Sequence, residues 1–207
     1  FKFPAFQAVQ DWFRRQVITE TKGVFSHVPV DGLQDLEFYS DTKCGTKDGR
    51  HGVVSVNCEV NGFHFVFGLG GIHGSIESSI VESSSDTVII DLDVVSYYPS
   101  VAIQNGFYPE HLSPVFCDVY AELLQRRKQY AKGTAENAAL KLALNGVYGD
   151  SNNAYSVFYD PKYTMSVTIN GQLALCLLSE MLIDQIPSLK MIQANTDGIT
   201  VQLDRDQ

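Results

Sequence analysis

The sequence predicts an α+β fold: a small antiparallel sheet with packed helices, and a further hairpin of two helices. Two observations carry this prediction. Residues 54–60 and 63–67 alternate apolar and polar side chains on either side of Asn61-Gly62, a pair typical of a two-residue hairpin turn. Several later segments have the helical spacing of apolar residues instead.

The N-terminal half is expected to hold one helix and one hairpin. Apolar residues at steps of three and four predict an amphipathic helix over residues 4–20, and residues 24–45 are expected to be irregular. The glycines of the segment Gly68 to Gly74 predict a loop, and so do the serines of residues 78–85.

The C-terminal half is expected to alternate between strands and helices. A buried strand is predicted over residues 87–93. Helices are predicted over 116–132, over 134–149 with Thr134 as N-cap, and over 166–185. Two last strands, 189–194 and 198–204, meet at a turn over residues 195–198.

Composition excludes several classes of protein. The 207 residues include 44% hydrophobic residues, which is enough for a packed core. The formal net charge of −9 argues against a generic nucleic-acid-coating protein, which would be basic. No apolar run approaches the length that spans a bilayer. Four widely spaced cysteines, without zinc-like spacing, favour reduced thiols in a cytosolic protein (Cys44, Cys58, Cys117 and Cys176).

Two aspartates are candidate metal ligands. Asp93 ends the strand predicted over residues 87–93, and Asp197 lies in the turn between the two last strands. If those strands are neighbours, the carboxylates converge, and Mg²⁺ is typically held by one or two carboxylates together with substrate phosphates. Taken alone, each aspartate is more often structural, because Asp is common in turns.

The helix over residues 134–149 presents a polar face. Lys141, Asn145 and Tyr148 are spaced i, i+4 and i+7, so they share one face, which suits a triphosphate and a base pair. A solvated amphipathic helix is the alternative interpretation. The same two interpretations apply to the basic cluster on the preceding helix (Arg126, Arg127, Lys128 and Lys132).

Three segments, in order, resemble the polymerase motifs of family B DNA polymerases, of the phage or mobile-element type. Residues 93–100, DVVSYYPS, resemble motif A; residues 141–149, KLALNGVYG, resemble motif B; residues 195–198, NTDG, resemble motif C. The resemblance covers about residues 85–204. The three motifs in this order are more specific evidence for the family than any single motif is.

The resemblance implies a role for each matching residue. Asp93 and Asp197 would be the catalytic, metal-binding carboxylates, with the backbone of Val94 as a further ligand. Tyr98 would lie under the incoming sugar and exclude a 2′-hydroxyl. The remaining nucleotide-binding residues would be Ser96, Tyr97, Arg127, Lys141, Asn145 and Tyr148.

The sequence also departs from the family pattern. Motif C begins with Asn195 where the family usually has Asp, and Asn cannot carry the charge. Gln193 replaces the usual Tyr, Tyr97 stands where Leu is usual, and Gly146 and Gly198 replace serines. Lys132 is one position out of register with the second basic residue of the family's finger helix, and Asp91 is an additional acid.

The resemblance divides the chain into a palm and fingers. Residues 1–86 would lead into the palm, 87–115 would be palm with motif A, 116–149 fingers with motif B, and 150–207 palm with motif C. The stretches before Asp93 and after Asp197 are too short for an exonuclease domain and a thumb, so both are expected to be absent, or to belong to other regions of a longer parent chain.

The resulting expectation is a DNA-directed DNA polymerase fragment that serves DNA replication. It would transfer a dNTP to a primer 3′-hydroxyl with two Mg²⁺ ions, or with Mn²⁺ as a substitute, and its partner would be primer–template DNA. Localisation is expected in the cytoplasm of a bacterial or phage-infected cell, without a membrane. Two alternatives stay open: a degenerate, non-catalytic palm that only binds DNA or a partner, and a palm-like enzyme such as a primase or nucleotidyl cyclase.

Overall fold

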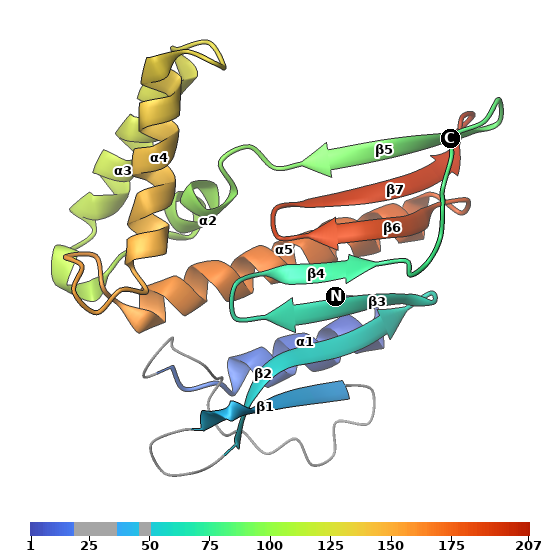
Figure 1. Ribbon diagram of the computed structural model, residues 1–207, viewed down its shortest axis with the longest axis horizontal. Helices are drawn as coiled ribbons and strands as arrows, with labels where there is room; N and C mark the ends of the chain where they lie inside the picture. Colours follow the sequence, from blue (N-terminus) through green and yellow to red (C-terminus); the bar gives the residue numbers. More distant parts are fainter. Residues whose placement is uncertain (19–36, 46–50) are drawn as a thin grey trace. The chain divides into compact units, whose positions relative to one another are not determined.

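The computed structural model describes residues 1–18, 37–45 and 51–207, with side-chain detail for residues 1–18, 37 and 55–207. It divides into two compact units. The sheet unit holds residues 1–17, the described part of 23–94, and 172–207, and the helical unit holds residues 95–171. Each unit is described separately (Figure 1).

The sheet unit confirms the α+β fold class. Its sheet has seven strands in the order β1-β2-β3-β4-β6-β7-β5, and every pair of neighbours is antiparallel. The strands are β1 (Glu37–Gly45), β2 (His51–Val60), β3 (Phe63–Gly68), β4 (Ile72–Ser75), β5 (Thr87–Asp93), β6 (Lys190–Asn195) and β7 (Gly198–Asp204).

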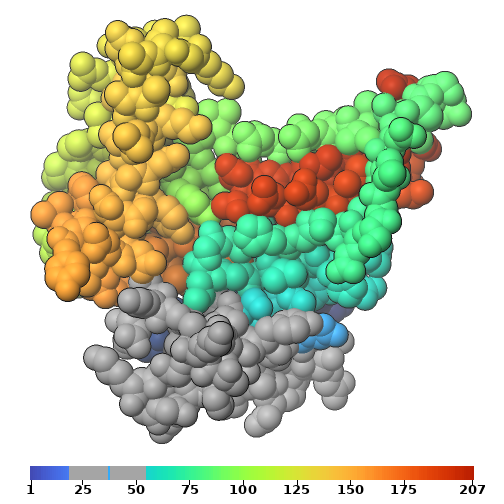
Figure 2. Space-filling model, in the orientation of Figure 1, coloured from blue at the N-terminus to red at the C-terminus, as the bar shows by residue number. Residues whose placement is uncertain are grey.

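Helix α1 (Pro4–Arg14) and residues 172–185 of helix α5 (Pro161–Gln185) cover one face of this sheet (Figure 1). The covering is aromatic: the Phe6 ring meets Phe65 at 5.1 Å between centroids, and the Phe13 ring meets Phe67 at 5.9 Å. Edge-to-face pairs of this kind stabilise a core beyond the area they bury. Figure 2 shows the opposite face, where the atoms of β4, β6, β7 and β5 lie at the surface.

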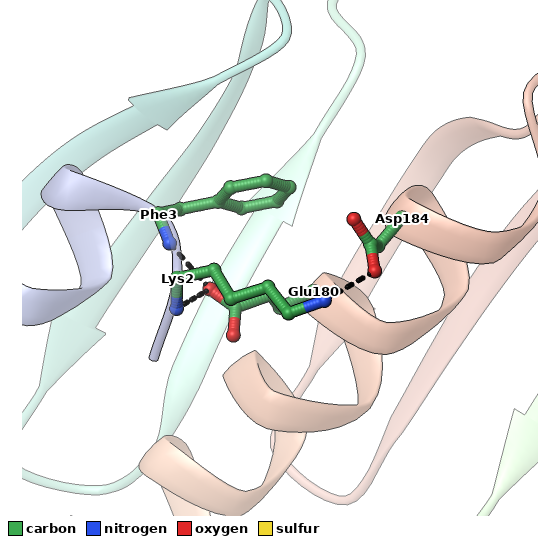
Figure 3. Close-up of polar contacts among 4 residues, drawn as sticks. All are labelled: Lys2, Phe3, Glu180 and Asp184. Atoms are coloured by element: carbon green, nitrogen blue, oxygen red, sulfur yellow. Dashed lines mark hydrogen bonds and ion pairs between the residues drawn. The ribbon is translucent and has the colours of Figure 1, made fainter.

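A buried carboxylate ties the N-terminus to α5. Glu180, which is 4% exposed, accepts hydrogen bonds from the backbone nitrogens of Lys2 at 2.8 Å and Phe3 at 2.6 Å (Figure 3). These N–H groups precede the first turn of α1, where a negative charge is favoured by the helix dipole. The Lys2 ammonium meets Asp184 at 2.6 Å in an exposed pair.

Within residues 95–171, the helical unit holds α2 (Tyr97–Asn105), the short 3₁₀ helix η1 (Glu110–Leu112), α3 (Val115–Lys128), α4 (Ala135–Asp150) and residues 161–171 of α5. Tyr120 of α3 donates a hydrogen bond to the carbonyl of Leu144 on α4 at 2.5 Å. Nearer the connecting turn, Asn137 of α4 donates to the carbonyls of Arg127 at 3.3 Å and Tyr130 at 2.9 Å. The two helices therefore run antiparallel and in contact.

The structure confirms the hairpin of β2 and β3 and its turn, since Asn61 and Gly62 both have positive φ, at 50° and 79°. Strands β6 and β7 and helix α4 also lie within a residue or two of their predicted ranges, and Thr134 caps α4 by accepting from the Asn137 nitrogen. Residues 78–85 lie outside any helix or strand, as predicted.

Several predicted elements were wrong in extent. The first helix ends at Arg14 instead of residue 20, and Val17, which was expected on its apolar face, is 68% exposed. The segment 24–45 is not wholly irregular: its residues 37–45 form β1, and its remainder lies outside the described residues. Helix α3, predicted over residues 116–132, ends at Lys128. Helix α5, predicted to begin at residue 166, begins five residues earlier, at Pro161.

Two predictions were wrong in kind, and one helix was not predicted. Residues 72–74 of the predicted glycine loop belong to β4, where a Cβ on Gly74 would lie 2.4 Å from the His64 carbonyl oxygen, so the glycine permits close pairing. Strand β5 lies at the sheet edge and is partly exposed instead of buried. Helix α2 was not predicted at all.

One helix of the described residues, α5, is long and apolar enough to cross a membrane by length and composition alone, although no such segment was predicted. Core helices of soluble proteins pass the same test. The buried side chains of Val167, Leu175 and Cys176 show that this helix contributes to the core.

Replacing Glu180 with Ala is expected to lower the free energy of unfolding by about 1–3 kcal/mol, because two part-buried N–H groups lose their charged acceptor. Replacing Asp184 with Ala removes only the exposed pair with Lys2 and is expected to change stability little. Urea unfolding of both variants measures the difference. Equal effects would contradict the anchoring role of Glu180.

Two buried thiols are expected to resist alkylation. Burial raises the pKa of Cys58 to about 12, and raises the pKa of Cys176 well above its ordinary value. A thiol with a raised pKa stays protonated until the pH approaches that pKa, so both thiols are unreactive at pH 8. Peptide mass spectrometry after iodoacetamide treatment should find them modified only in urea. Modification at the same rate in native and denatured chains would contradict the core described above.

Candidate functional site

The pairing of β5 with β7 determines where the backbones of the two candidate aspartates, Asp93 and Asp197, lie along the strands. The register is unbroken over the whole of β5, and it places Asp93 opposite Gly198, the residue that follows Asp197. The backbone nitrogen of Val94 donates to the carbonyl of Asp197 at 2.9 Å, which closes the end of the ladder. The strands are therefore neighbours, as the convergence of the two acids requires.

Gly198 permits this close pairing. A Cβ at this position would lie 2.7 Å from the Leu92 carbonyl oxygen and 3.3 Å from the Asp93 Cα. The first of these distances is shorter than real Cβ contacts allow, so a side chain would push β7 away from β5. The departure from the family's serine at residue 198 therefore has a structural reason in this chain.

The turn between β6 and β7 is held from its other side. Thr196 has a φ of 43°, in the left-handed region, and its nitrogen donates to the carbonyl of Ile72 at 2.8 Å. The glycine-rich segment is anchored in turn by Gln172 of α5, which is 1% exposed. Its side-chain amide accepts from the Gly68 nitrogen at 3.1 Å and donates to the Gly68 carbonyl at 3.0 Å.

The acids lie on the open face of the sheet. Asp91 and Asp93 are exposed, and Asp91 accepts a hydrogen bond of 2.7 Å from the Thr200 hydroxyl. One cross-strand row runs from His73 through Asn195 and Gly198 to Asp93. A cavity of about 800 Å³ opens on the same face and includes His73, Gln193 and Asn195 among its lining residues.

The donor set suits a hard cation. Asp93 and Asp197 offer carboxylate oxygens at the ends of adjacent strands, and Mg²⁺ prefers oxygen ligands and commonly keeps several waters. No group of three or more His, Cys, Asp or Glu side chains able to hold a metal occurs among the described residues. Two carboxylates leave most coordination positions of such an ion to other ligands, such as water.

The helical unit brings together Ser96, Arg127 and Asn137. Arg127 donates to the Ser96 hydroxyl at 2.7 Å and to the Asn137 side-chain oxygen at 3.4 Å. Ser96 is the N-cap of α2 and has a left-handed backbone, with φ of 54°. A held guanidinium beside a helix N-terminus is an arrangement that favours anions.

The same unit brings together Tyr98 and Tyr148. Their rings stack with centroids 4.0 Å apart and planes inclined by 23°. Burial raises the pKa of the Tyr148 phenol, so it stays protonated at neutral pH. Tyr97 is buried, and its hydroxyl donates to the carbonyl of Gly171, so its side chain is part of the packed interior of this unit.

The other two predicted residues of α4 lie on its exposed face. Lys141 and Asn145 are exposed, as a binding role requires, while Leu144 on the opposite face is fully buried. Leu140 and Val147 are half-buried, so the apolar face is less complete than its spacing predicts. The structure describes Asp93 and Asp197 in the sheet unit and the nucleotide-binding candidates in the helical unit.

Sequence reasoning missed the buried polar groups that hold these residues. Asn137, Thr168 and Gln172 are buried polar residues on helices, and none of them was singled out from the sequence. A signal for Thr168 was present, because Thr164 and Thr168 stand four residues apart, the spacing that puts two residues on one face of a helix. Ser96 was named as a nucleotide-binding residue from the motif A resemblance, but its left-handed backbone and its hydrogen bond from Arg127 were not predicted.

Comparison with known proteins gives limited information. No family model matches the sequence, and no curated protein matches it. Among solved structures, the chain is similar to the family B DNA polymerase from the hyperthermophilic archaeon Pyrobaculum calidifontis, with a TM-score of 0.39 and 14% sequence identity. The match covers 62% of this chain and spans only 24% of that chain.

Replacing Gly198 with Ala is expected to lower the free energy of unfolding by about 1–3 kcal/mol, because the added methyl group meets the β5 backbone. Gly146 provides the matched control, since it also stands where the family has serine. A Cβ there meets nothing within 4 Å, and Ala is expected to stabilise α4 by about 0.5–1 kcal/mol. Thermal unfolding measures both. A neutral Gly198→Ala variant would contradict the described strand pairing.

Proposed function

We propose that this chain is the palm and fingers region of a family B type DNA polymerase and transfers a deoxynucleotide to a primer 3′-hydroxyl. The observation that carries the proposal is the register of β5 and β7, which sets Asp93 beside the turn that holds Asp197. These are the acids of the motif A and motif C segments. The ordered motifs between them support the same assignment.

Each part of the proposed chemistry has a residue in the chain. Asp93 and Asp197, with the backbone of Val94, would hold Mg²⁺, or Mn²⁺ in its place. When bound, the two ions supply charge stabilisation for in-line displacement at phosphorus. Arg127, held by Ser96 and Asn137, would bind the triphosphate together with Lys141, and Asn145 and Tyr148 would line the base-pair pocket.

The reaction balances without another reactant. The primer oxygen forms a bond to the α-phosphorus, the bond from that phosphorus to the bridging oxygen breaks, and pyrophosphate leaves. The primer hydroxyl gives its proton to solvent. The contribution of the protein is to position the reactants and stabilise charge.

A non-catalytic palm is the second candidate. Asn195 favours it, because the exposed amide at the end of β6 adds no charge to the pair of acids. The two candidates differ in one measurable property: a catalytic palm needs the metal-loaded acids for incorporation, whereas a binding palm retains DNA affinity without them.

Replacing Asp93 or Asp197 with Ala is expected to reduce nucleotide incorporation on the order of 10³-fold, because the metal ligands are lost. Primer extension with Mg²⁺ and with Mn²⁺ measures it. Asp204→Ala is the matched control, since Asp204 lies at the far end of the same strand pair, opposite Thr87. Full incorporation by either Asp93→Ala or Asp197→Ala would contradict the proposed catalysis. DNA binding without incorporation by the unmodified chain would favour the non-catalytic candidate.

A further inference from the structure

Hydroxyl groups form a continuous chain between α4 and α5 in the helical unit. The Tyr148 hydroxyl lies 2.6 Å from the Thr168 hydroxyl, and the Thr168 hydroxyl donates to the carbonyl of Thr164 at 2.8 Å. Thr168 is fully buried. A polar group in such a position must be hydrogen-bonded, because an unmet bond there is costly.

The chemistry of the groups fixes the direction of these bonds. A carbonyl can only accept, so the single proton of the Thr168 hydroxyl lies toward Thr164. The remaining contact then has Tyr148 as donor and Thr168 as acceptor. Removing the Thr168 oxygen would therefore leave the Tyr148 hydroxyl without this acceptor.

Residues 168–171 of α5 hydrogen-bond two tyrosines that adjoin Tyr98, one in space and one in the sequence. Tyr148, held through Thr168, stacks on the Tyr98 ring at 4.0 Å. Tyr97, which precedes Tyr98 in the chain, donates its hydroxyl to Gly171, three residues beyond Thr168. A Cβ on Gly171 would lie 3.2 Å from the Tyr97 ring, so the helix backbone and this ring are closely packed.

We propose that Thr168 is a positioning residue for sugar selection, which acts through the Tyr148 hydroxyl on the stacked ring of Tyr98. The inference rests on the proposed function, in which the Tyr98 ring excludes the 2′-hydroxyl of a ribonucleotide. Exclusion by a ring depends on where that ring stands, and small displacements of a positioned group have large effects on reaction rates.

Thr168→Val tests the proposal, because valine keeps the shape of the side chain and removes its oxygen. The ratio of kcat/KM for dNTP to kcat/KM for rNTP is expected to fall about tenfold in primer extension. Thr168→Ser keeps the hydroxyl and should restore the ratio. Tyr98→Ala gives the full loss of discrimination as a reference.

Thr164→Val is the matched control. Thr164 is also buried in α5, and its hydroxyl contacts Ser151 at 2.8 Å, while its backbone carbonyl remains available to Thr168. The control should lose stability without any change in sugar discrimination. A general loss of packing would lower the rates with both nucleotides and leave their ratio unchanged.

A second readout does not depend on activity. Stacking on Tyr148 shifts the NMR signals of the Tyr98 ring protons upfield, and Thr168→Val should lose this shift while Thr168→Ser and Thr164→Val keep it. An unchanged ratio, or unchanged ring signals, in Thr168→Val would overturn the positioning role and leave the proposed function standing. An unmodified chain that incorporates no nucleotide would overturn the proposed function and, with it, the role in sugar selection.

Discussion

The antiparallel register of β5 and β7 is the constraint on which the candidate site depends. Because side chains alternate between the faces of a strand, this register puts Asp91 and Asp93 on the open face and turns Leu92 toward the core side. A slip by one residue would exchange the two sets. The glycine at residue 198 lets the two strands approach closely at the end of the ladder, beside Asp93 and Asp197.

Around that register, buried polar groups hold the segments that carry function. Gln172 clamps Gly68, and the segment that follows Gly68 accepts the hydrogen bond of Thr196 beside Asp197. In the helical unit, Asn137 supports Arg127 in the same manner. Each group is a side chain on a helix that fixes the backbone or side chain of a neighbouring element. These contacts hold the neighbouring segments in fixed positions, which a flexible loop would not do by itself.

The sequence predicted the elements that local patterns encode. Strand alternation and the Asn61-Gly62 turn were sufficient for the β2–β3 hairpin, and motif spacing selected Asp93 and Asp197. It failed where tertiary packing decides: β4 forms in a glycine-rich segment because Gly74 lets another strand approach, and β5 proved to be an edge strand. The hydroxyl chain through Thr168 could not be predicted, because partners such as Thr168 and Tyr148 come from different helices.

The central claim is that Asp93 and Asp197 together bind a divalent cation. Backbone NMR spectra recorded during titration with Mn²⁺ test it most directly, because the paramagnetic ion broadens the signals of nearby amides. The account predicts that the amides of residues 92–94 and 196–199 broaden first, and that Asp93→Ala abolishes this broadening. Broadening that begins elsewhere in the chain, or that persists unchanged in Asp93→Ala, would contradict it.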